Sequence, residues 1–174
     1  MSEFQLLGIV IGISLIGLVV AYLLARWVLK KDTGSDAMRE ISNAIKEGAE
    51  AFLRRQNKTI LILALALTAV LFIGYGFVRS HRSFDPIDST VAFAFWIALS
   101  FIFGAVCSMI AGYIGMWTSI RANIRTAAGT MKNLNEGLRI ALRSGAVSGL
   151  LVVAMSLLGV SGLYALVRLT TDVE

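Results

Sequence analysis

The sequence predicts an all-α integral membrane protein with four transmembrane helices and long helical extensions outside the membrane. Hydrophobic residues make up 57% of the 174 residues and charged residues 16%, against roughly 45–50% and about 25% in soluble globular proteins. Mean hydropathy is +0.77. The charged residues are clustered, and long apolar runs separate the clusters. A chain this apolar is not intrinsically disordered. A single Cys and a single His exclude an internal disulfide and a Cys/His zinc site.

Four runs without a charged residue are each longer than the roughly 18 apolar residues that indicate a transmembrane helix. We place the four spans at about 6–28, 59–78, 89–120 and 144–167, within a single transmembrane unit that covers residues 1–174. At about 1.5 Å per residue the third run would be roughly 48 Å long, against a hydrocarbon core of about 30 Å. The third helix must therefore tilt strongly or project from the bilayer.

The first run is predicted to be a retained helix and not a signal peptide. Residues 1–5 carry no positive charge, and the run is longer than the roughly 7–15 apolar residues of a signal sequence. The positive residues Arg26, Lys30 and Lys31 follow the run. This arrangement sends the N-terminus outward.

The distribution of Lys and Arg predicts the orientation in the membrane. Thirteen of the 16 Lys and Arg residues lie within 26–58 and 121–143, and the three others are Arg79, Arg82 and Arg168. Basic residues concentrate on the cytoplasmic side of membrane proteins. We therefore expect cytoplasmic segments at about 29–58 and 121–143, with both termini and the loop 79–88 on the non-cytoplasmic side.

Both cytoplasmic segments have helical periodicity. In the first, Ser35 or Asp36 could cap a helix that continues into the second span, with Lys46–Glu50 and Glu50–Arg54 as ion pairs at i, i+4. The segment 121–143 is similar, although glycines weaken the case for an unbroken helix. The two glycines are Gly129 and Gly137.

The first cytoplasmic segment also holds the densest group of acids. A Mg²⁺ or phosphate-handling cluster is one interpretation, but the acids are interleaved with bases and need not converge on one point. We favour a solvated, charge-paired helix face. The acids are Asp32, Asp36, Glu40, Glu47 and Glu50. We predict no catalytic, cofactor-binding or metal-binding residue in this chain. Arg54, Arg55 and Lys58, just before the second span, are expected to anchor the helix at lipid headgroups, with anionic lipid as a further possible ligand.

The charge-free runs of the spans, 6–25, 59–78, 89–120 and 144–167, contain small residues but no Asp, Glu, Lys, Arg or His. Proton and ion pathways normally need an ionisable group inside the membrane, so these spans alone should not form one. Small residues at four-residue spacing predict close helix packing; they are Gly8/Gly12 with Gly17/Ala21 nearby, Gly104/Ser108/Gly112 and Gly145/Gly149. The remaining polar groups can hydrogen-bond between helices: Ser14, Thr68, Ser100, Cys107, Ser108 and Ser156.

Two stretches carry a family resemblance. Residues 45–60 read IKEGAEAFLRRQNKTI, and residues 112–126 read GYIGMWTSIRANIRT, followed at 143–150 by RSGAVSGL. The first resembles the EGA-x-AFL-x-RQ segment of the membrane-bound inorganic pyrophosphatases, and the second resembles their GYIGM…RAN-x-RT segment. The order of the motifs and the outward N-terminus also agree with that family.

The resemblance implies a large homodimeric pump that couples pyrophosphate hydrolysis to transport of H⁺ or Na⁺, of which this chain would be the N-terminal part. Mg²⁺ is the implied cofactor, with ligands outside this chain, because the family's D-x-x-x-D-x-x-x-K pattern is absent here. The expected partners are the lipid bilayer and the remainder of the pump, in the same or a separate chain. The residues that match the motifs are expected to hold cytoplasmic helix ends in place by charge pairing and carbonyl capping: Glu47, Arg54, Arg55, Gln56, Arg121, Asn123 and Arg125.

Other functions remain possible from the sequence. The main alternative is a free-standing four-helix structural or accessory membrane protein without catalytic activity. An unrelated channel subunit is disfavoured by the charge-free spans. A nucleic-acid partner is not expected, because the bases follow membrane topology and no nucleic-acid-binding motif accompanies them. The absence of a targeting segment favours a prokaryotic plasma membrane.

Overall fold

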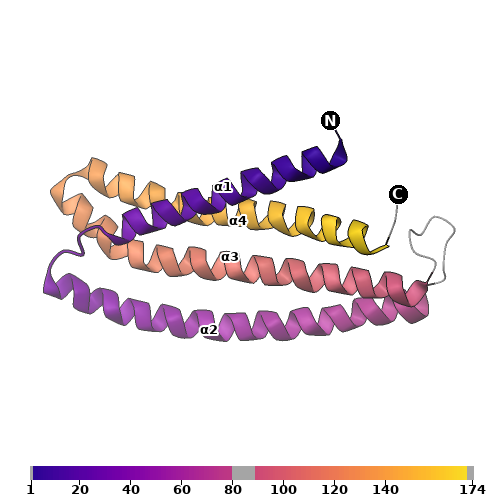
Figure 1. Cartoon of the computed structure of the whole chain (residues 1–174). Helices are drawn as coiled ribbons and strands as arrows, with labels where there is room; N and C mark the ends of the chain where they lie inside the picture. The colour runs from indigo at the N-terminus through magenta and orange to yellow at the C-terminus, as the bar shows by residue number, and fades with distance from the viewer. Residues whose placement is uncertain (1, 80–88, 172–174) are drawn as a thin grey trace.

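The computed structural model describes residues 2–79 and 89–171 (Figure 1). The helices are α1 (Glu3–Leu29), α2 (Asp36–Ile73), α3 (Thr90–Lys132) and α4 (Leu134–Thr171), and α2 ends in a π-helical turn, η1 (Gly74–Val78). All four are long and apolar enough to cross a membrane. The predicted fold class, an all-α membrane protein with four spanning helices and long extensions, is confirmed. Of the predicted loop at 79–88, only Arg79 is among the described residues, and His81 and Arg82 lie outside them.

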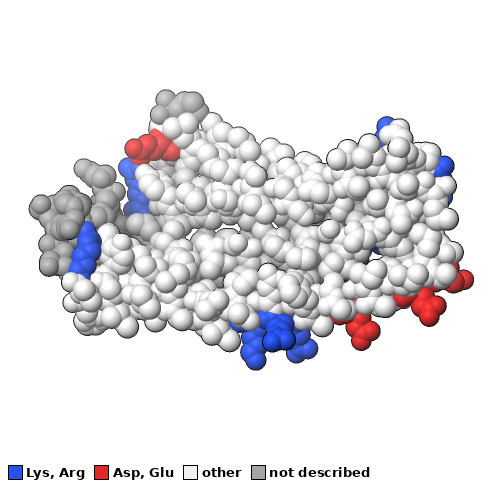
Figure 2. All heavy atoms as spheres, turned by 180° about the vertical axis from the view of Figure 1, so that it is seen from behind, with Lys and Arg blue, Asp and Glu red and all other residues white. Residues whose placement is uncertain are grey.

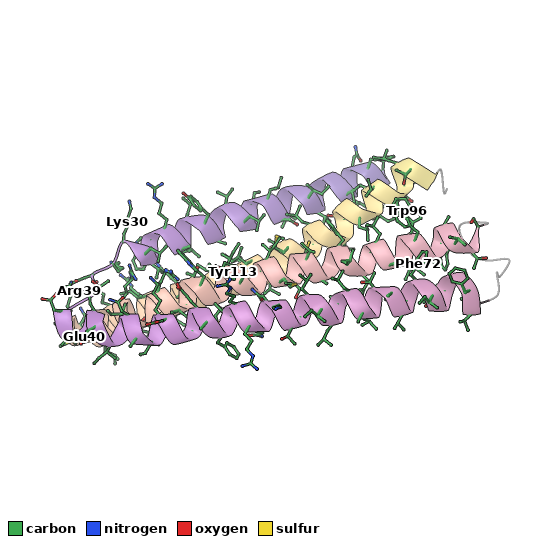
Figure 3. All side chains as sticks on the ribbon, turned by 90° about the horizontal axis from the view of Figure 1, so that it is seen from below. Lys30, Arg39, Glu40, Phe72, Trp96 and Tyr113 are labelled. Atoms are coloured by element: carbon green, nitrogen blue, oxygen red, sulfur yellow. The ribbon has the colours of Figure 1, made fainter. Side chains whose placement is uncertain are left out.

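The four helices form an open layer and not a closed bundle. α4 packs between α1 and α3, and α2 packs along the other side of α3, so that α1 and α2 lie apart (Figures 1 and 3). α2 buries only Leu53 and Ala64 over its whole length. Large apolar side chains therefore remain exposed on every helix, as expected of surfaces that face lipid or further helices.

The two ends of the layer differ in chemistry. The N-terminus of α1, the C-terminus of α4 and η1 lie at one end, and the linker between α1 and α2 and the turn at Asn133 lie at the other (Figure 1). At the first end Glu3 forms an ion pair with Arg168, which joins α1 to α4. Lys30, Arg39 and Glu40 lie at the opposite end (Figure 3), which we call the charged end.

Serine side chains start three of the helices. Ser2 and Gln5 form a capping box on α1, and Ser89 accepts from the Ala92 amide at the start of α3. Of the two predicted caps for α2, Ser35 is the one used, and its hydroxyl accepts from the Met38 amide at 3.3 Å. These bonds satisfy amides that have no partner within the helix.

The segment 121–143 is not one helix. It reverses at Asn133, whose extended backbone ends α3 and whose side chain accepts from the Glu136 amide at 2.7 Å to start α4. Gly129 and Gly137 lie where the two helices meet: a Cβ on Gly137 would come within 2.1 Å of the Thr130 hydroxyl oxygen. The glycines that weakened the helix prediction are the residues that permit this hairpin.

Only part of the predicted small-residue pattern packs between helices of this chain. A Cβ on Gly17 would meet Ala154 at 3.4 Å, and Ala21 is buried against α3 and α4. Gly115, outside the predicted stripes, is also tightly packed, since a Cβ there would meet Ser148 at 2.9 Å. The other stripe glycines would have no atom within 4 Å of an added Cβ: Gly8, Gly12, Gly104, Gly112, Gly145 and Gly149.

The hydroxyl groups in the spans bond within their own helices. Ser14 donates to the Val10 carbonyl at 2.7 Å, and Thr68 and Ser100 donate in the same way to the carbonyls of Ala64 and Trp96. The prediction that these three hydroxyls link different helices is wrong. A carbonyl four residues earlier is always within reach of a helical Ser or Thr, so this bond forms at little entropic cost.

Candidate functional site

The charged end is the candidate functional site, and Arg121 connects two of its helices. The guanidinium of Arg121 forms an ion pair with Glu50 of α2 at 2.7 Å and lies over the Trp117 ring at 3.9 Å from its centroid. The sequence had predicted that Glu50 pairs with Lys46 and Arg54 on its own helix. In the structure Glu50 pairs with Arg121 of α3 instead. This pair connects the cytoplasmic parts proposed for α2 and α3.

Arg125 caps the end of α1. Its Nε donates to the Leu29 carbonyl at 3.1 Å, and its Nη1 donates to the Arg121 carbonyl. The last carbonyls of a helix have no partner within it and lie at the negative end of its dipole, so a cation is stabilising there. The charge pairing and carbonyl capping expected of Arg121 and Arg125 are thus both observed. Among the described residues, the other motif residues make no side-chain hydrogen bond or ion pair; they are Glu47, Arg54, Arg55, Gln56 and Asn123.

The linker between α1 and α2 is held by the hairpin. Asp32 accepts from the Gly34 amide at 3.0 Å and forms an ion pair with Lys132 at 3.0 Å. Lys31 pairs with Glu136 at 3.6 Å. Gly34 has a φ of 72°, which a residue with a side chain rarely adopts. The linker therefore has one local turn and two ion pairs that fix it to the end of α3 and the start of α4.

Both partners of Asp32 lower the pKa of its carboxyl below the ordinary value of 3.8, the Gly34 amide most and Lys132 next. A lowered pKa means that the contribution of Asp32 to stability is complete above its ordinary pKa and is lost as the pH falls through its folded-state pKa.

We expect exchange of the Gly34 amide to accelerate on acidification, relative to its intrinsic rate. Asp32→Asn should reduce this pH dependence. If Gly34 amide exchange depended on pH in Asp32→Asn as it does in the wild type, the stabilising role of the Asp32 carboxylate would be contradicted.

The acids of the charged end do not form a metal site. Within 2–79 and 89–171, no three His, Cys, Asp or Glu side chains come close enough to hold an ion. Asp32, Asp36 and Glu50 instead pair with three different bases, namely Lys132, Arg39 and Arg121. The residues present do not fit Mg²⁺, which needs several oxygen ligands around one point.

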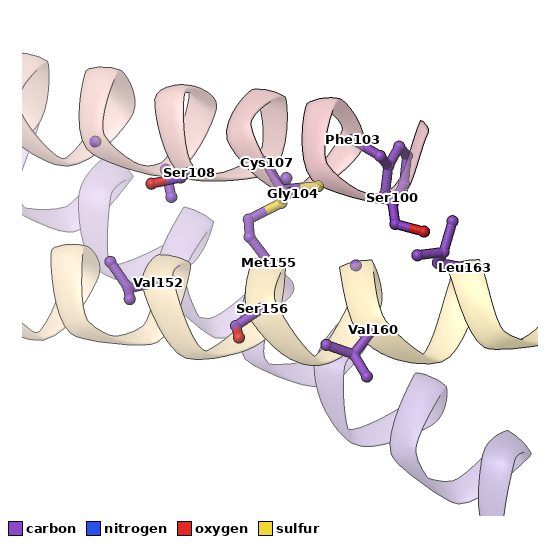
Figure 4. A pocket seen from close by; sticks show the side chains of 13 residues that line it. Ser100, Phe103, Gly104, Cys107, Ser108, Val152, Met155, Ser156, Val160 and Leu163 are labelled. Atoms are coloured by element: carbon purple, nitrogen blue, oxygen red, sulfur yellow. The ribbon is translucent and has the colours of Figure 1, made fainter. Parts of the chain in front are cut away.

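A pocket in the middle of the layer has no Asp, Glu, Lys, Arg or His among its lining residues. It has a volume of about 400 Å³ and lies between α3 and α4 (Figure 4). Its polar or thiol side chains are Ser100, Ser108, Ser156 and Cys107, and the rest of its lining is apolar. Such a lining can accommodate a neighbouring helix or a lipid chain.

The bases of α2 also indicate where the membrane surface lies. Arg54, Arg55 and Lys58 are exposed halfway along α2, and from there to η1 the helix has no charge (Figure 2). The groove between α2 and α3 places Gln56 and Asn57 together with Tyr113 and Met116 of α3. Tyr113 and Met116, near the end of the third apolar run, are therefore level with these bases of α2. The apolar run of α3 thus extends farther toward the charged end than the apolar run of α2 does.

Comparison with known proteins assigns the family. The sequence model of the family described as inorganic H⁺ pyrophosphatase matches residues 15–174. This chain belongs to that family. The match includes all of α2, α3 and α4 and about half of α1.

Curated relatives of this chain carry names that agree with the family. It is 42% identical over 160 residues to a K⁺-insensitive pyrophosphate-energized proton pump of Caldanaerobacter subterraneus subsp. tengcongensis, covering 91% of this chain and 22% of the relative. It is 38% identical over 164 residues to the pyrophosphate-energized membrane proton pump 3 of Arabidopsis thaliana, covering 93% and 20%. The chain thus spans about a fifth of the length of these relatives. No solved structure matches it.

Proposed function

We propose that this chain is the N-terminal, non-catalytic part of a pyrophosphate-energised ion pump. The observation that carries the proposal is the family match over residues 15–174, together with coverage of only 20–22% of the pumps it resembles. On this proposal the four helices support the helices that hold the substrate. The transported ion is H⁺, as in the names of the relatives, and Na⁺ is the alternative.

The chemistry of the chain supports a scaffold role. Pyrophosphate hydrolysis needs several groups that neutralise phosphate charge and position the attacking water, and no three acids converge within the described residues. We therefore propose that Mg²⁺, as the cofactor of the complete pump, is bound by residues outside this chain. The spans likewise lack an ionisable residue for an ion path.

The exposed small-residue stripes support further helices as partners. The stripe glycines have no neighbour within 4 Å of an added Cβ, and glycines in a membrane helix allow a second helix to approach closely. We propose that the remainder of the pump packs against these faces, and that the complete protein is a homodimer. No partner residue is assigned.

The grouping of the bases supports the proposed orientation. The segments 29–58 and 121–143, which together with Arg26 hold thirteen of the 16 Lys and Arg residues, occupy the half of the layer that contains the charged end. The positive-inside rule makes that end cytoplasmic and both termini non-cytoplasmic. We keep the prokaryotic plasma membrane as the proposed location.

A graft onto a relative tests the function. The 174-residue chain expressed alone should release no phosphate from Mg²⁺-pyrophosphate. A chimera should hydrolyse pyrophosphate and acidify vesicles when this chain replaces the matching portion of the Caldanaerobacter pump. The chimera should also keep a substantial part of the parent's activity.

Two results would contradict the proposal. One is Mg²⁺-dependent hydrolysis by the purified chain, which would mean that it has its own active site. The other is an inactive chimera that nevertheless inserts and assembles like the parent pump. The parent pump and a chimera with an unrelated four-helix membrane segment are the controls.

A further inference from the structure

A pocket at the charged end combines four cationic side chains without a lining acid. It has a volume of about 230 Å³ and lies between α2, α3 and the linker. Its lining consists of four bases, three neutral polar residues and two isoleucines: Thr33, Arg39, Ser42, Asn43, Lys46, Ile120, Arg121, Ile124 and Arg125. The residues from α2 recur at spacings of three and four, so they share one helix face. That face is turned toward the two arginines of α3.

Two of the four cations are not balanced by a carboxylate. Arg39 pairs with Asp36, and Arg121 pairs with Glu50. Lys46 has no ion pair within the described residues, and Arg125 donates only to backbone carbonyls. The pocket therefore carries an excess of positive charge, which attracts an anion.

The surroundings of Arg125 disfavour its positive charge. Partial burial lowers the pKa of its guanidinium most, and the neighbouring positive charge of Arg121 lowers it further. Two guanidinium groups on adjacent turns repel each other unless an anion lies between or beside them. Arg forms paired hydrogen bonds with phosphate oxygens, and the hydroxyl and amide groups of Ser42 and Asn43 can donate to the same ligand.

We propose that this pocket binds a phosphate group. The ligand is either a soluble phosphate compound such as pyrophosphate or phosphate, or the headgroup of an anionic phospholipid. Along α2, Lys46 precedes the charge-free run at Thr59 by roughly 20 Å of helix, whereas Ile120, the last residue of the third apolar run, lines the pocket itself. Both sources can therefore reach the pocket, and the experiment distinguishes them. The inference concerns residues of this chain and does not rest on the proposed pump function.

Binding to the full 174-residue chain tests the site. The chain is reconstituted in nanodiscs of phosphatidylcholine and titrated with inorganic pyrophosphate, inorganic phosphate and, as a control anion, chloride. In a second arm the nanodiscs contain phosphatidylglycerol, and the bound lipid is measured after detergent exchange. The first arm detects a soluble ligand and the second a lipid headgroup.

Lys46→Gln is the test variant, and Arg139→Gln is the control. Both remove one positive charge near the charged end, but Arg139 is an exposed base of α4 outside the pocket. Lys46→Gln should weaken binding about tenfold, as expected for loss of one hydrogen bond to a charged group. Arg139→Gln should bind like the wild type. Lys46→Arg should retain binding, and circular dichroism should show equal helix content in all variants.

The outcomes distinguish a soluble ligand, a lipid headgroup and the absence of a binding site. Binding of pyrophosphate or phosphate that depends on Lys46 supports a soluble ligand, and Lys46-dependent retention of phosphatidylglycerol supports a lipid. Absence of binding in both arms overturns the site. Equal effects of Lys46→Gln and Arg139→Gln also overturn it, because general charge attraction would then explain the result. None of these outcomes depends on hydrolytic activity.

Discussion

Gly137→Ala should destabilise the chain by about 1–3 kcal/mol, the usual cost of overpacking a tight contact. A Cβ at this position would lie 2.1 Å from the Thr130 hydroxyl oxygen and 3.0 Å from the Thr130 backbone nitrogen. The backbone cannot move away without opening the α3–α4 hairpin. Circular dichroism during denaturation with sodium dodecyl sulfate measures the change in unfolding free energy.

Gly145→Ala on the same helix is the control. No atom lies within 4 Å of a Cβ there, and alanine is favoured over glycine in a helix by up to about 1 kcal/mol. The two substitutions should therefore have opposite signs. Thr130→Ala should rescue part of the effect of Gly137→Ala by removing the nearest atom. Equal effects of the two glycine substitutions would contradict the packing seen at the hairpin.

The second large effect is expected at Arg125. Arg125→Ala removes the donor to the Leu29 carbonyl and should weaken the attachment of the end of α1 to α3 by about 2 kcal/mol, the range for hydrogen bonds that involve a charged group. Hydrogen exchange of the amides at 24–30 should accelerate by roughly ten- to thirtyfold if exchange follows local opening. Exchange within α2 should change little, because α2 makes no comparable contact with α1.

Arg139→Ala is the matched control for this effect. Arg139 is an exposed base on α4 with no side-chain hydrogen bond or ion pair among the described residues, so its removal should leave exchange at 24–30 unchanged. Arg125→Lys should keep the positive charge near the helix end but lose the planar geometry of the guanidinium, and it should show an intermediate rate. Wild-type exchange in Arg125→Ala would show that the cap contributes nothing to stability.

The number of helices could be predicted from the sequence because charge-free runs and clustered bases follow from the physics of the bilayer. A run longer than about 18 apolar residues has few stable alternatives to a spanning helix. The continuity of α2 from Asp36 into its span was predictable from the same periodicity, since no Pro interrupts it. The cap at Ser35 was likewise one of two local choices.

The interactions of the charged end could not be predicted from spacing along one helix. Glu50 has bases at four residues on either side, yet it pairs with Arg121 of α3, because partners at i, i+4 on an exposed helix contribute only about 0.3–0.5 kcal/mol. The cap of Arg125 on Leu29 joins residues far apart in sequence. The family motifs had singled out both arginines but not their partners.

By itself, then, the sequence determined that four apolar helices span a membrane, that their bases gather in two segments, and that the spans carry no ionisable group. These properties depend on composition and on local periodicity, which do not depend on contacts between residues far apart in the sequence. The tertiary structure alone decided that the helices form an open layer, that Gly17, Gly129 and Gly137 are packed while most of the predicted stripe glycines are not, and that Arg39, Lys46, Arg121 and Arg125 share one pocket. Each of those depends on which faces meet, and in a membrane protein apolar faces toward lipid and toward another helix look alike in sequence.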